Sequence, residues 1–115
     1  MKSAAQSYYA GRRGNCAQAV AAAWIAVSGS GAVSVADFSS CGRGKAPEGL
    51  CGALYAACVC APENKARILS MFSDRTGGHV SCRAIRENRA ADCVSCVGFA
   101  AEILQNTAGI GGGDN

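Results

Sequence analysis

The longest apolar segment without a charge lies in the middle of the chain, between Gly49 and Cys60. Pro47 and Glu48 precede it and suit a helix start, because proline needs no hydrogen-bond partner in the first turn and an acid favours that end. The pattern therefore predicts a buried central helix that begins at these residues, holds Cys51 in its first turn and ends before Pro62.

Apolar residues recur at helical spacing on both sides of this segment. Asn15 is a good N-cap, and glycines at 29 and 31 end the apolar stripe that follows it. The further helices that we expect cover residues 3–10, residues 16–28, a segment from Pro62 to before Gly77, a short segment with Cys82, and a last segment beginning at Cys93.

These elements predict an all-α fold, a small single-domain bundle of about five helices in which several helix N-termini converge on a cysteine site. We expect residues 1–108 to form this domain and the glycine-rich residues 109–115 to form a flexible tail. Residues 33–38 fit either a short helical turn or an extended piece.

Composition and charge narrow the classes of function. The net charge of +3 is too small and too dispersed to indicate a nucleic-acid partner, and the apolar stretch 17–27 is too short to span a membrane. Only 17% of the residues are charged, which makes a homodimer a reasonable expectation. The first residues lack the apolar core of a secretory signal, so we expect a cytoplasmic protein.

Eight cysteines in 115 residues are the main chemical signal. A secreted chain would use them for disulfides, whereas in a reducing compartment cysteines more often bind metal or carry out redox chemistry. The simpler interpretation is that they are small buried hydrophobes in an alanine-rich core.

Four of the cysteines share a position at a predicted helix start. Cys16, Cys82 and Cys93 each follow a capping residue directly, and Cys51 lies near the start of the central helix. Helix N-termini offer free N–H groups and partial positive charge, which stabilise thiolates and anionic metal–sulfur clusters. We therefore expect these four cysteines to be the metal ligands, with Asn15, Gly52, Ser81 and Arg83 beside them.

The chain also resembles a known family at these positions. Asn-Cys-Ala at 15–17, Cys-Gly-Ala-Leu at 51–54, Ser-Cys-Arg at 81–83 and Cys93 are similar to a family of redox-active proteins with the cysteine pattern C…CGAxxG…C…C. The resemblance covers roughly residues 4–105, and Ala56 stands where the pattern has glycine. It implies a redox role and, as cofactor, an iron–sulfur cluster.

Three further cysteines are candidates for the same site. Cys41 lies in a glycine-containing loop, Cys58 follows Cys51 by two helical turns, and Cys96 follows Cys93 by one turn. Cys96 could be a resolving thiol, a substitute ligand or part of the core. Cys60 is expected to point elsewhere on its helix.

Three functions remain open from the sequence. The first is an iron–sulfur protein of unknown cluster type that transfers electrons to an unknown redox partner protein. The second is a thiol–disulfide oxidoreductase or thiol redox sensor without metal, in which Cys93 or Cys51 attacks and Cys96 resolves. The third is a structural zinc-binding domain, which widely separated single cysteines fit poorly. An electron carrier or redox module fits better than a classical enzyme.

Overall fold

The computed structural model describes residues 1–29, 33–42 and 45–108, and this part of the chain is an all-α bundle, as the sequence predicts. It contains six α-helices and three short 3₁₀ turns, and no strand longer than an isolated bridge. The α-helices are α1 (Lys2–Ala10), α2 (Cys16–Ser28), α3 (Gly52–Cys60), α4 (Lys65–Arg75), α5 (Cys82–Glu87) and α6 (Cys93–Ala108). The 3₁₀ turns are η1 (Val35–Phe38), η2 (Pro47–Gly49) and η3 (Pro62–Asn64). The predicted tail lies outside the described residues.

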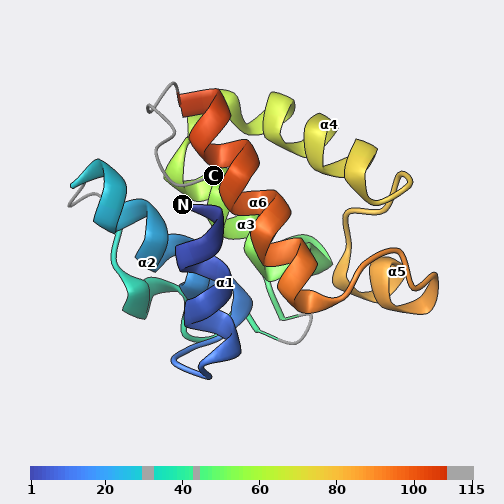
Figure 1. Cartoon of the computed structure of the whole chain (residues 1–115). Coiled ribbons are helices and arrows are strands. Elements are labelled where there is room, and N and C mark those ends of the chain that lie inside the picture. Colours follow the sequence, from blue (N-terminus) through green and yellow to red (C-terminus); the bar gives the residue numbers. More distant parts are fainter. Residues whose placement is uncertain (30–32, 43–44, 109–115) are drawn as a thin grey trace.

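Helices α3 and α6 form the centre of the bundle (Figure 1). Helix α3 packs against α2, α4 and α6, and α6 also packs against α1 and α2. Six of the nine residues of α3 are buried, and most of them are small. Thin side chains allow close helix–helix contact, which brings the starts of several helices near one another.

The larger buried side chains fill the space around this alanine-rich centre. Leu54 of α3, Ile68 and Phe72 of α4, and Ile103 and Leu104 of α6 are all fully buried. The hydrophobic positions that the sequence pattern assigns to helix faces therefore do form the core. Within the described ranges, no helix is both long and apolar enough to cross a lipid bilayer.

The start of the central helix differs from the prediction. Pro47–Gly49 forms the separate turn η2, Leu50 is extended, and α3 begins only at Gly52. The backbone reverses here because Glu48 and Gly49 adopt positive φ angles of 62° and 70°, which a continuous right-handed helix does not contain. Cys51 is therefore the N-cap of α3 and not a residue of its first turn.

The helix expected from Pro62 also begins later than predicted, because Pro62–Asn64 forms the turn η3 and α4 begins at Lys65. The three predicted starts that follow a capping residue agree with the structure. Asn15 forms a capping box with Gln18 at the start of α2, and Ser81 accepts a hydrogen bond from the Ala84 amide at the start of α5. The Asp92 carboxylate accepts one from the Ser95 amide at the start of α6, with a distance of 2.7 Å. Each cap fixes the residue that follows it at the first helical position.

Candidate functional site

A cavity of about 950 Å³ opens between the starts of α2, α3, α5 and α6. Five of the eight cysteines line it, namely Cys16, Cys51, Cys82, Cys93 and Cys96. The described lining also includes Asn15, Gly42, Gly52, Arg12 and Arg86. The four cysteines expected as ligands therefore share one space, and Cys96 shares it with them.

Four of the cysteines that line the cavity lie at helix starts, where N-capping residues fix their positions. Cys16, Cys82 and Cys93 each occupy the first position of a helix, directly after the capping residue. Cys51 is itself the N-cap of α3. At these positions a side chain lies beside N–H groups that the helix leaves without partners.

Backbone contacts hold the separate helix starts together. Leu50 and Ser81 form an isolated antiparallel bridge, and the Cys51 amide donates a hydrogen bond to the Val80 carbonyl over 2.9 Å. This bridge places the start of α5 beside the start of α3. The Asn15 side-chain amide donates to the carbonyls of Phe38 and Ser39, at 2.9 and 3.3 Å, and so ties the loop after η1 to the start of α2.

Gly52 lies where three segments come closest. A Cβ atom at this position would lie 2.6 Å from the Cys41 carbonyl oxygen and 2.7 Å from Cys16 Sγ. Both distances are far below van der Waals contact, and one partner is backbone. Glycine is therefore required here, because only a residue without a side chain allows α2 and the loop at Cys41 to approach α3 this closely.

The first amides of α3 serve two sulfur atoms. The Ala53 N–H lies close enough to Cys16 and Cys51 to lower the pKa of each thiol, and the Leu54 N–H lowers the pKa of Cys51 as well. Burial still raises the pKa of Cys16 to about 12, with the neighbouring Cys51 adding to that shift. The backbone amides at the start of α3 therefore lie beside two thiols, Cys16 of α2 and Cys51 of α3 itself.

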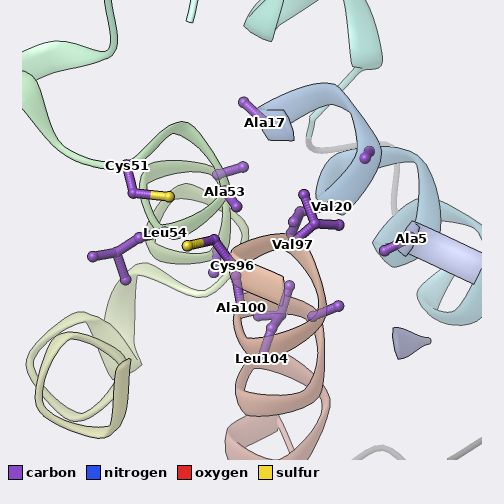
Figure 2. Packing of buried hydrophobic residues seen from close by; sticks show 14 of the residues in the cluster. Ala5, Ala17, Val20, Cys51, Ala53, Leu54, Cys96, Val97, Ala100 and Leu104 are labelled. Carbon is purple, nitrogen blue, oxygen red and sulfur yellow. The ribbon is translucent and has the colours of Figure 1, made fainter. Parts of the chain in front are cut away.

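Cys51 and Cys96 are directly paired. Figure 2 shows their sulfur atoms pointing toward each other between α3 and α6. The Cys96 thiol donates a hydrogen bond to Cys51 and lowers the pKa of Cys51 to about 7, although burial opposes this shift. The same hydrogen bond raises the pKa of Cys96, and burial acts in the same direction. Cys51 is therefore the thiol of this pair that loses its proton first.

Three cysteines do not reach the cavity lining. Cys41 is buried, and its carbonyl rather than its thiol is what approaches Gly52. Cys58 lines a separate cavity of about 340 Å³ on another side of α3, and burial raises its pKa despite the nearby Lys65. Cys60 is half-buried, and burial raises its pKa to about 12.

The residues expected beside the ligands have different positions. Asn15 and Gly52 line the cavity, and Ser81 caps α5. Arg83 faces solvent instead, with 87% of its side chain exposed and its Nε donating to Glu87 over 2.9 Å. Position 83 follows directly after Cys82, so its side chain projects about 100° around the helix from that of the cysteine.

Sequence reasoning did not assign Arg12 and Arg86 to the site. Arg86 lies four residues after Cys82, which places both on one face of α5, and this spacing was the available signal. Arg12 lies in the turn between α1 and α2 with a positive φ of 58°, which local sequence does not indicate. Among the described lining residues there is no Asp or Glu, so the charged side chains at this cavity are cationic.

The cysteines share the cavity without forming a compact ion site. Among the residues that the structure describes, no three or more His, Cys, Asp or Glu side chains are placed so that they could hold a metal ion. Comparison of the chain with models of protein families, with curated protein sequences and with solved structures gives no match. Conclusions about function therefore depend on the site itself.

The close approach at Gly52 gives the first prediction. Gly52→Ala should lower the free energy of unfolding by about 1–3 kcal/mol, because the added methyl group has to displace the Cys41 backbone and Cys16. Chemical denaturation followed by circular dichroism measures this change.

Gly98→Ala is the matched control. Gly98 is also a buried helical glycine, but its added Cβ would meet only the flexible ends of Gln6 and Lys2. Alanine also gains up to about 1 kcal/mol of helix propensity over glycine. Gly98→Ala should therefore be close to neutral, and equal destabilisation by both substitutions would contradict the role assigned to Gly52.

The Cys51–Cys96 hydrogen bond gives a prediction for pH dependence. Because the thiolate is the reactive form, alkylation of Cys51 in the reduced, metal-free protein should rise through pH about 7. Cys96→Ala removes the donor and leaves the burial, so the midpoint should move to higher pH. Mass-spectrometric mapping of iodoacetamide adducts measures both midpoints.

Cys60 is the internal control in this experiment, since burial raises its pKa to about 12 and it should react slowly across the same range. The other thiols and charges that line the cavity are unchanged in Cys96→Ala, so they do not account for a shift of the Cys51 midpoint. They belong to Cys16, Cys82, Cys93, Arg12 and Arg86. An unchanged Cys51 midpoint in Cys96→Ala would show that the hydrogen bond does not set this pKa.

Proposed function

We propose that this protein is a small redox protein that binds an iron–sulfur cluster in the cysteine-lined cavity and transfers electrons. The observation that carries the proposal is the shared cavity of Cys16, Cys51, Cys82 and Cys93, which come from the starts of four separate helices. Four thiolates are the usual ligand set of such clusters.

The chemistry of the cavity wall suits a negatively charged group. The Ala53 amide lowers the pKa of Cys16 and Cys51, and the Leu54 amide lowers that of Cys51. N–H···S contacts stabilise thiolate-bound clusters and tune their reduction potential. Arg12 and Arg86 add positive charge at the same cavity. These donors and charges would offset the negative charge that iron-bound thiolates and sulfide concentrate there.

The residues of the chain have distinct tasks in this proposal. Cys16, Cys51, Cys82 and Cys93 hold the cluster, which when bound supplies a centre that accepts and donates single electrons. In the described part of the chain these thiols do not form an ion-binding group. The proposal therefore requires their side chains to turn into the cavity on binding.

The surroundings of the cavity fit electron transfer to a protein partner. Cys51 is 6% exposed, whereas Cys93 is exposed at the start of α6. The cluster would therefore lie near the surface at Cys93, where a redox partner could approach it. We place this function in the cytoplasm, because a reducing compartment keeps thiols available as ligands.

Single cysteine variants purified without oxygen test the ligand assignment. Cys16→Ser, Cys51→Ser, Cys82→Ser and Cys93→Ser should each lose most of their iron and visible absorption, because serine is a poor ligand for cluster iron. Iron analysis and visible spectra measure the effect, with circular dichroism to verify folding.

Cys58→Ser and Cys60→Ser are the controls. Both residues lie on α3, outside the cavity lining, and both variants should retain iron and colour. Wild-type colour in all four ligand variants would contradict the assignment, as would an equal loss in the two controls.

A further inference from the structure

Cys51 and Cys96 form a pair that the proposed ligand set of four cysteines does not use, because Cys96 is not one of those ligands. Cys51 caps α3 and Cys96 lies in the first turns of α6, and their thiols share a hydrogen bond. Both residues are buried, with exposed fractions of 6% and 4%. A disulfide needs its two sulfur atoms at about 2.05 Å. Here the sulfur atoms are already neighbours on two helices that pack together (Figure 2).

The cavity gives this pair a route to a small molecule. Both cysteines line the cavity of about 950 Å³, which is within the range of about 300–1,000 Å³ that small-molecule sites occupy. A buried thiol at a cavity wall can be attacked from the cavity side, whereas the protein covers its other sides.

The charges at the cavity select the kind of molecule. Arg12 and Arg86 both line the cavity, and the described lining contains no carboxylate. Both guanidinium groups are at exposed residues, so they stand at the solvent side of the cavity. Like charges around an opening raise the local concentration of oppositely charged small molecules.

We infer that, when the cavity holds no metal, Cys51 and Cys96 act as a thiol–disulfide exchange site for a small anionic disulfide. The pair shares Cys51 with the proposed cluster site but does not require a cluster. Cys51 is the attacking residue, because it is the N-cap of α3 and its side chain lines the cavity beside the N–H groups that the helix start leaves free. Cys96 is the resolving residue, because it is the thiol that lies against Cys51.

The reaction balances in two steps. The Cys51 thiolate attacks one sulfur of the small disulfide, the substrate S–S bond breaks, and one thiolate leaves and takes up the proton that Cys51 released. Cys96 then gives up its proton and attacks the Cys51 sulfur of the mixed disulfide, and the second thiol leaves with that proton. Two protein thiols have been oxidised to one disulfide, and the substrate disulfide has been reduced to two thiols.

Disulfide mapping of the wild-type chain is the direct test. Reduced, chelator-treated protein is incubated with glutathione disulfide, quenched with acid, digested and analysed by mass spectrometry. We expect a Cys51–Cys96 disulfide as the main protein product. Glutathione attached chiefly to Cys82 or Cys93, with no Cys51–Cys96 disulfide, would overturn the inference.

Two variants separate the attacking and the resolving residue. Cys96→Ser should accumulate a glutathione adduct on Cys51, because the residue that resolves it is absent. Cys51→Ser should form no disulfide at Cys96. Cys60→Ser is the control, because Cys60 lies on α3 but outside the cavity lining. This variant should form the Cys51–Cys96 disulfide as the wild type does. An adduct on Cys51 that resolves equally fast without Cys96 would count against the pairing.

The charge requirement has its own measurement. We compare the rate of disulfide formation with glutathione disulfide, which is anionic, and with hydroxyethyl disulfide, which is neutral. In the double variant Arg12→Gln/Arg86→Gln the ratio of the first rate to the second should fall about tenfold. This is the low end of electrostatic effects on association rates. Arg67→Gln, an exposed position on α4, is the control and should leave the ratio unchanged. An unchanged ratio in the double variant would overturn the preference for anions.

Failure of this inference and failure of the cluster proposal are distinguishable. A chain that binds iron and sulfide but never forms the Cys51–Cys96 disulfide contradicts the exchange site alone. A chain that forms this disulfide but binds no iron supports the exchange site and contradicts the cluster.

Discussion

The close contact between the first residue of α3 and its neighbours is the constraint on which the site depends. At Gly52 the Cys41 carbonyl and the Cys16 sulfur occupy the space that a side chain would fill. This contact sets how near α2 and the loop after η1 lie to α3, and therefore where the Cys16 thiol is. The alanine-rich faces of α2 and α3 extend the same close packing along the two helices. Larger side chains at these faces would move the cysteine-bearing ends apart.

The chemistry of the cavity follows from this packing. Because α3 begins at Gly52, its first amides lie beside the sulfur atoms of Cys16 and Cys51 and lower the pKa of both thiols. The start of α6 approaches from the other side and adds Cys93 and Cys96. Donors and five of the thiols are therefore concentrated around this cavity, while apolar side chains such as Leu104 are buried further along α6. Both proposed chemistries, cluster binding and thiol exchange, use this one concentration of thiols and donors.

Much of this arrangement could be predicted from local sequence, because it depends on caps and apolar spacing. Asn15, Ser81 and Asp92 mark their helix starts by residue type, and each places a cysteine at the next position. The sequence predicted that α3 begins at Pro47 and Glu48, which is too early. Glu48 has a positive φ angle that its residue type does not favour, so this break before α3 depends on tertiary contacts and not on local sequence. The Cys51–Cys96 hydrogen bond also depends on how α3 packs against α6, and the sequence left open whether Cys51 or Cys93 pairs with Cys96. Sequence patterns thus identify which residues start helices, whereas the pairing of their side chains is decided by packing.

The central claim is that the thiols around this cavity act together on one cofactor. The most direct measurement is the content of iron and acid-labile sulfide per chain, with a visible spectrum, in wild-type protein produced and purified without oxygen. The account predicts iron and sulfide in similar amounts and broad visible absorption that disappears when the cluster is removed by a chelator under oxidising conditions. Colourless protein without iron or sulfide, in which all eight cysteines titrate as free thiols, would contradict it.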